Sequence, residues 1–302
     1  MGALRVRFEL DIEDPGAERL SHLVGTWLDG GSTAVAAQHR RRLDEGPELS
    51  RKAFTSAIPC GPAFGAWGLL ALERTTAPRK SLRIPTTAAV RSLPGRVDDA
   101  LTSARIALYT LDAQGYPETS HIDMWVIRNP KAPQTLAFMF AVPESDLADP
   151  AIEKTCVDFL HSFAEQVDPL YGETAYDDGM PGAKTVIETL VGPPWRSYRD
   201  TLPTARRQLR GYGWLTVVPR ELVPTVGGIA GLRASGAFAE VAPLPSGAVW
   251  LRATEHYGDY SGESAEAIVR ALAPILPPGL PDLRFGRTGV PYKVALVDPS
   301  TL

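Results

Sequence analysis

The sequence predicts an α+β fold, in which helices pack on one face of a largely antiparallel sheet. Three observations lead to this prediction. The chain opens on a strand pattern, three strand patterns follow in close order between residues 103 and 142, and the amphipathic helices come after groups of strands. Strands and helices do not alternate regularly enough for a doubly wound parallel sheet. Helices and strands should therefore occur in separate runs.

The first hundred residues open on a strand followed by a helix. Apolar and charged side chains alternate over residues 4–12, as in a strand with one wet face. A helix should follow and end at Gly30 and Gly31, because its apolar face recurs at helical spacing: Leu20, Leu23, Val24, Trp27 and Leu28. Further along we expect a helix near 47–57, a short strand at 67–72 and a loop over 85–99.

The middle of the chain predicts an antiparallel meander and then a long helix. Residues 104–111, 120–127 and 134–142 read as strands joined by turn-forming residues. The helix follows Pro150, and one apolar stripe runs along it: Ile152, Cys156, Phe159, Leu160, Phe163 and Val167. Cys156 lies on this stripe, which favours a core thiol.

The last third repeats the order of strands followed by a helix. A helix is expected at 182–191, a strand at 214–218 and short helices at 220–226 and 229–234. A hairpin of 238–242 with 249–254 precedes an amphipathic helix that ends before Pro277. The repeated order raises a diverged duplication as one interpretation. We expect a single domain over residues 1–302, with a subdivision into 1–95 and 96–302 left open.

Composition narrows the class of protein. The net charge of -4 provides no global basic field for nucleic acid. Two distant cysteines, Cys60 and Cys156, are typical of a reduced, intracellular protein. Charges at every second position near the start are incompatible with a signal peptide, and no apolar run is long enough to span a membrane. We therefore expect a cytoplasmic protein with no membrane and no direct nucleic-acid partner.

Two groups of polar residues could support chemistry. His121 and Asp123 share a strand face and could supply two metal ligands, but no third ligand accompanies them, and a half-polar strand face explains the pair more simply. Glu255, His256 and Asp259 could serve acid–base chemistry, although a turn before a helix explains them more simply. We expect no catalytic residue, no metal and no cofactor.

Segregated charge is the stronger signal. Between residues 144 and 182, ten acidic residues stand against Lys154 alone, whereas six arginines stand against Asp200 between 195 and 220. Such segments can orient a partner, or they can pair with each other inside the fold. Tyrosines beside carboxylates suit a protein interface. We read residues 168–173 as an acidic loop, and the predicted partner-binding residues around it are Glu165, Asp168, Tyr171, Glu173, Tyr176, Asp177 and Asp178.

The V-D-P-L-Y-G-E block followed by R-G-Y-G-W-L-T-V-V-P resembles a bacterial immunity-protein family associated with type VI secretion effectors of the VRR-nuclease type. The residues that match its aromatic strand, G-G turn and following helix are Gly211, Tyr212, Trp214, Gly227, Gly228, Leu232 and Arg233. The resemblance extends over roughly residues 100–277. The resemblance implies a non-enzymatic cytoplasmic antidote that neutralises a cognate toxin through an acidic surface. A basic nuclease would fit such a surface. The arginine-rich segment departs from this pattern.

A second hypothesis belongs to another class. An enzyme or small-molecule-binding protein of a biosynthetic pathway would need a pocket with a few convergent polar groups. The aromatic and histidine residues that could line one are His121, Trp125, Trp214, Trp250 and His256. A deep pocket would favour the enzyme or small-molecule-binding hypothesis, whereas a flat acidic patch would favour the antidote hypothesis. The oligomeric state stays open.

Overall fold

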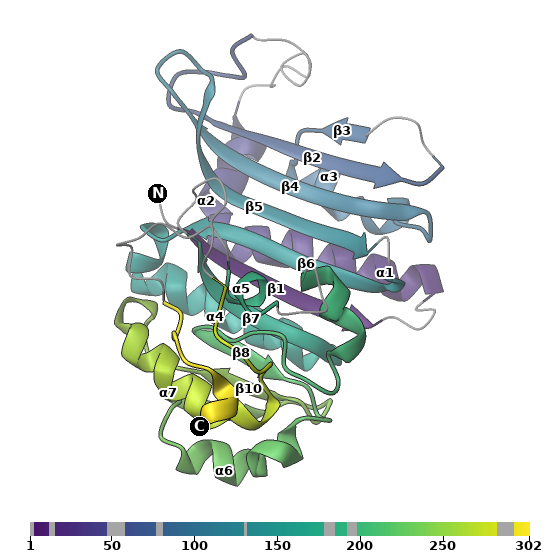
Figure 1. Ribbon diagram of the computed structural model, residues 1–302. Helices are drawn as coiled ribbons and strands as arrows, with labels where there is room; N and C mark the ends of the chain where they lie inside the picture. The colour runs from purple at the N-terminus through teal and green to yellow at the C-terminus, as the bar shows by residue number, and fades with distance from the viewer. Residues whose placement is uncertain are drawn as a thin grey trace. The chain divides into compact units, whose positions relative to one another are not determined.

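The computed structural model describes residues 3–11, 16–46, 58–76, 81–129, 132–177, 185–191, 198–282 and 293–302 (Figure 1). The fold is α+β with antiparallel strands, which confirms the predicted class. Two compact units divide the chain. We call Asp11–Asp146 with Lys154–Phe163 the meander unit, and Met1–Leu10, Leu147–Glu153 and Ala164–Leu302 the terminal unit. Residue 95 lies within the meander unit. The single domain and its subdivision near that residue stay predictions.

The meander unit contains the antiparallel strands β2 (Ala66–Arg74), β3 (Ser81–Arg83), β4 (Leu101–Leu111), β5 (Pro117–Asn129) and β6 (Ala132–Pro143). Their order is β3-β2-β4-β5-β6. The predicted meander is therefore confirmed in β4, β5 and β6, and the strand predicted at 67–72 lies in β2.

The first helix does not end at Gly30 and Gly31, so that prediction is wrong. Helix α1 (Gly16–Gly25) continues through a π-helical turn (Thr26–Gly30) into α2 (Gly31–Glu45), which packs against β2, β4 and β5 (Figure 1). Gly31 is helical in backbone conformation, and a Cβ there would overlap the side chain of Met124 and touch Phe159. The glycine therefore permits close packing and does not terminate the helix.

Two further predictions concern the neighbouring segments. The helix near 47–57 lies outside the described residues. The prediction of a loop over residues 85–99 is wrong in part, because α3 (Thr87–Arg91) and a 3₁₀ turn (Pro94–Arg96) lie within this range. The Thr86 hydroxyl accepts a hydrogen bond from the Ala89 N–H at 3.2 Å and caps α3.

Aromatic side chains form the core of the meander unit. Trp27 packs against four phenylalanine rings with centroids 4.7 to 5.7 Å away: Phe138, Phe140, Phe159 and Phe163. Two of these rings lie on the predicted helix α4 (Pro150–Glu165), which the structure confirms. Cys60 and Cys156 are buried free thiols, as expected of Cys156 on its apolar stripe.

The terminal unit contains β1 (Ala3–Asp11), β7 (Pro169–Asp177), β8 (Leu215–Val218), β9 (Glu240–Pro243) and β10 (Val249–Arg252) in the order β1-β7-β8-β10-β9. Its helices are α5 (Val186–Thr189), α6 (Gly228–Ala234) and α7 (Gly262–Leu272), so the helix expected at 182–191 is shorter in the described part. The predicted hairpin is confirmed as β9 and β10. The strand orders of the two units differ, and the possible duplication stays a prediction.

Among the described residues, no helix combines the length and apolar character needed to cross a bilayer.

Candidate functional site

Residues 169–177 form strand β7 and not the predicted acidic loop. β7 pairs antiparallel with β1, and Arg7 and Glu9 lie opposite Glu173 and Tyr171. Tyr171 is 0% exposed and Glu173 3% exposed. Their placement in the predicted partner-binding surface is therefore wrong, because residues two apart on a strand share one face and this face is covered. Sequence analysis missed the strand because its glycine and carboxylates suggested a loop.

The remaining acidic residues have mixed environments. Asp168 is half-buried and lies 3.4 Å from both Arg206 and Arg220. The acidic and arginine-rich segments thus pair with each other at this point, one of the two alternatives left open by the sequence. Glu165 is exposed, and Tyr176 is half-buried with the Lys293 ammonium 5.9 Å from its ring.

Two of the predicted partner-binding residues have no described side chain. Asp177 is described only in its backbone, and Asp178 lies outside the described residues. As partner-binding residues, Glu165, Asp168, Tyr176, Asp177 and Asp178 stay predictions.

The G-Y-G-W segment that precedes β8 packs against β7. A Cβ at Gly211 would overlap the Tyr171 hydroxyl, and one at Gly213 would overlap the Thr174 carbonyl oxygen. The Tyr212 hydroxyl accepts a hydrogen bond from the Ala295 N–H at 2.9 Å. The Trp214 indole N–H donates to the Thr254 carbonyl at 3.1 Å. This motif therefore serves packing inside the terminal unit.

A buried polar network lies beside this motif. The Arg210 guanidinium forms an ion pair with Glu9, and Arg7 contacts the other oxygen of Glu9 at 3.1 Å. The Tyr171 hydroxyl donates a 2.5 Å hydrogen bond to Glu173. Burial raises the pKa of Glu173 to about 7 and lowers the pKa of Arg210 to about 9. The network is internal, so it stabilises the fold and offers no surface to a partner.

The residues of the hypothetical pocket do not form one within the terminal unit. Trp214 and Trp250 are 0% exposed and lie in the core. His256 is exposed, and its Nδ1 lies 3.0 Å from Glu153, whose other oxygen accepts the Tyr257 N–H. The buried tryptophans present no surface to a ligand beside His256.

The other two pocket residues belong to the meander unit, on β5. The Arg105 guanidinium lies 5.2 Å from the Trp125 ring and donates two hydrogen bonds to Asp123 at 2.7 and 2.5 Å. His121 Nδ1 lies 3.0 Å from Asp146. His121 and Asp123 thus have different partners, and no cluster of three or more His, Cys, Asp or Glu suited to a metal ion occurs within the described ranges.

A groove in the meander unit is the candidate site that sequence analysis missed. We call it the α2–α3 groove; its volume is about 630 Å³, and it continues into a second hollow of about 400 Å³ through shared lining residues. Helix α2, the π-helical turn and α3 supply its lining: Asp29, Gly30, Thr33, Ala34, Ala37, Arg40, Arg41, Asp44, Thr87 and Arg91. π-helical turns are frequent at functional sites.

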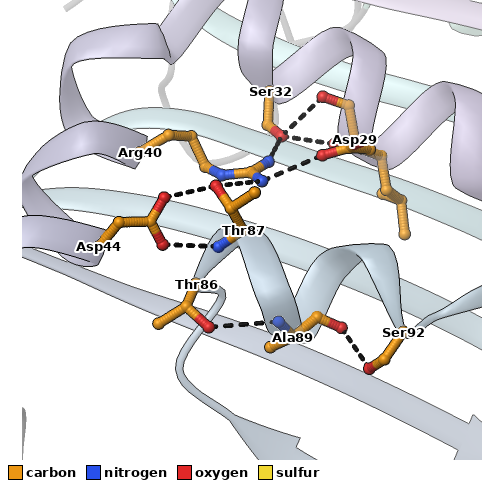
Figure 2. Close-up of polar contacts among 9 residues, drawn as sticks. Asp29, Ser32, Arg40, Asp44, Thr86, Thr87, Ala89 and Ser92 are labelled. Carbon is orange, nitrogen blue, oxygen red and sulfur yellow. Dashed lines mark hydrogen bonds and ion pairs between the residues drawn. The ribbon is translucent and has the colours of Figure 1, made fainter.

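Arg40 holds two walls of the α2–α3 groove together (Figure 2). Its guanidinium donates to Ser32 at 2.5 Å and Asp29 at 3.0 Å on one wall, and to Thr87 at 3.3 Å on the other. Asp44 also binds Thr87, accepting its backbone N–H at 2.7 Å and its hydroxyl. The sequence signal was the Arg40–Arg41–Arg42 run, because three consecutive helical residues cannot all face solvent in one direction.

Comparisons with known proteins give a structural likeness. No family model and no curated protein matches this sequence. Among solved structures, the Pseudomonas aeruginosa type VI secretion system (T6SS) protein PA0821 is similar over 99% of this chain and 80% of its own, with a TM-score of 0.55 and 14% identity. The likeness shows a shared fold.

Proposed function

We propose that this protein is a non-enzymatic immunity protein that binds and neutralises a toxin of a type VI secretion system in the cytoplasm. The observation that carries the proposal is the likeness to the T6SS protein PA0821 over nearly the whole chain. The sequence resemblance to immunity proteins supports the same role. The five residues of the alternative enzyme pocket have structural partners or core positions, which weakens that alternative.

The partner is proposed to be a basic toxin such as a nuclease, and the contact is proposed to include Glu165 at the end of α4 and Asp177 at the end of β7. Glu165 is exposed, and Asp177 ends β7. Carboxylates on a surface attract a basic partner and orient its approach.

Capture of the partner tests the proposal. The purified protein would serve as bait for lysate of its native host, with washes at low and then high salt, and the captured protein would be co-expressed with and without the bait. We expect a stoichiometric basic protein that salt releases and that is toxic without the bait. A captured protein with no toxicity, or a small molecule on the bait in place of a protein, would contradict the proposal.

Charge reversal then tests the surface. Asp177→Lys with Asp178→Lys should abolish protection and leave the melting temperature nearly unchanged. Glu18→Lys with Asp99→Lys is the matched control, because both carboxylates are exposed and lie in the meander unit. Protection that survives the change at Asp177 and Asp178 would exclude this surface.

A further inference from the structure

The α2–α3 groove has two cationic side chains with no partner in the described part of the chain. Arg41 and Arg91 are exposed and line the groove, and neither makes a hydrogen bond or ion pair with a described residue. Arginine presents a planar fork of N–H donors that matches a carboxylate. Two such forks at one groove are suited to carboxylate ligands.

The groove floor contains a buried donor with unused capacity. The Arg40 side chain is 5% exposed, and its Nε has no hydrogen-bond partner among the described residues. A buried guanidinium N–H without a partner is costly, and a ligand atom in the groove would relieve this cost. The groove is therefore a site with donors both at its rim and on its floor.

The groove is also held open before any ligand arrives. Arg40 and Asp44 tie Thr87 on α3 to α2 and the π-helical turn, as Figure 2 shows. Three of the residues of α2 that line the groove have small side chains: Thr33, Ala34 and Ala37. Small side chains leave room for an extended segment, and fixed walls reduce the entropy lost on binding.

Two carboxylates distinguish between classes of ligand. Asp29 and Asp44 line the same groove, and Asp29 is 37% exposed. The phosphate backbone of a nucleic acid carries a negative charge at every phosphate and has no N–H donor for these two carboxylates, whereas a peptide backbone offers N–H donors beside its carboxylates. Charge complementarity therefore favours a protein segment.

We propose that the α2–α3 groove docks a carboxylate-bearing segment of the protein partner, with Arg41 and Arg91 binding its carboxylates, Arg40 donating from the floor, and Asp29 and Asp44 accepting its N–H groups. This inference rests on the proposed function for the identity of the partner. It adds a binding site in the meander unit to the acidic surface of the terminal unit.

The test uses defined probes, so it does not depend on the toxin. The full chain would be titrated with a short capped peptide of alternating glutamate and serine, with its glutamine counterpart, and with a thymidine oligonucleotide of equal charge. Amide NMR shifts would report affinity and location. We expect the glutamate peptide to bind best and to shift residues of α2 and α3.

Variants decide between specific docking and nonspecific attraction. Arg41→Glu with Arg91→Glu should weaken binding of the glutamate peptide roughly tenfold, because two exposed charge-assisted contacts are lost. Arg19→Glu with Arg207→Glu makes the same charge change at exposed arginines outside the groove and should change binding little. Thermal unfolding checks that each variant is folded.

Several results would overturn the docking proposal: no binding of the glutamate peptide, equal binding of the glutamine peptide, stronger binding of the oligonucleotide, or equal losses in both double variants. Failure of the proposed function is recognised separately. If the peptide binds as expected but no toxin is captured or neutralised, the docking proposal is retained and the proposed immunity function is rejected.

Discussion

Among the described residues, each unit contains a buried arginine paired with a carboxylate, and the two arginines have different surroundings. Arg210 in the terminal unit pairs with Glu9, and both side chains are at most 5% exposed. Arg40 in the meander unit is equally buried, but its partner Asp29 is 37% exposed and lines a groove. An arginine–carboxylate ion pair is thus part of the core in one unit and forms the floor of an open groove in the other.

This difference separates a structural role from a candidate binding role. The Arg210 guanidinium lies 5.7 Å from the ring of Tyr171, and both side chains are buried in the core of the terminal unit. Hydroxyls and small side chains surround Arg40, and its Nε is unpaired within the described ranges. Residue type alone does not distinguish the two, whereas the exposure of the carboxylate does.

Arg210→Met should give the largest loss of stability, about 4 kcal/mol, because removal of one partner leaves the buried Glu9 carboxylate with Arg7 alone. Chemical denaturation of the full chain would measure it. Arg207→Met is the matched control at an exposed neighbour and should cost less than about 0.5 kcal/mol. Similar losses in the two variants would remove the structural role assigned to Arg210.

Gly213→Ala should cost about 3 kcal/mol in the same measurement, because the new methyl group would overlap the backbone oxygen of Thr174, and backbone cannot move aside as a flexible side chain can. At Gly258, in the same unit, a Cβ would meet nothing within 4 Å. Gly258→Ala is therefore the control. A well-tolerated alanine at Gly213 would show that the G-Y-G-W segment is not tightly packed.

The sequence predicted elements better than it predicted surfaces. Turn-forming residues between closely spaced strand patterns identified the meander, and one apolar stripe at helical spacing identified α4. Sequence analysis missed strand β7 because the strand is covered on both faces and carries Glu173, and glutamate is rarely buried. Gly31 suggested a helix end, whereas its role depends on Met124 and Phe159, which lie far away in the sequence.

The candidate site was less predictable than the fold. The α2–α3 groove depends on α3, which sequence analysis took for a loop, and on Arg40 turning inward from a basic run. Long-range contacts of this kind leave no local pattern. The pairing of Asp168 with Arg206 and Arg220 was one of two stated alternatives, and only the folded chain could choose between them.

Arg40→Leu should cost about 2 kcal/mol, less than the change at Arg210, because solvent reaches Asp29 and can hydrate its carboxylate once the guanidinium is gone. Denaturation again measures the loss, and the peptide titration measures the groove. Arg42→Leu is the control, because Arg42 lies two residues further along the arginine run and is exposed. A cost equal to that of Arg210→Met would contradict the distinction between an open and a closed site.

Opposite responses to pH provide the smallest expected effect and the sharpest comparison. Burial, then the neighbouring His121 and Arg42, lowers the pKa of His39 from 6.5 to about 4. The unfolded chain therefore binds the extra proton first, so stability present above pH 6.5 is lost as the pH falls towards 4. His39 stacks on His121 at 3.9 Å and contacts the Thr110 hydroxyl, and His121 faces Asp146 and the Val35 carbonyl.

Glu173 has the reverse sign in the terminal unit. Its pKa is raised from 4.5 to about 7, so the stability that it contributes is complete below pH 4.5 and is lost as the pH rises through 7. Each effect should be on the order of 1 kcal/mol, since neighbouring charges adjust as the group titrates. Amide hydrogen exchange, resolved by unit, would measure both. His39→Gln should flatten the acid-side loss in the meander unit alone and Glu173→Gln the alkaline-side loss in the terminal unit alone, whereas equal flattening of both units by either variant would show that the two cores do not respond independently.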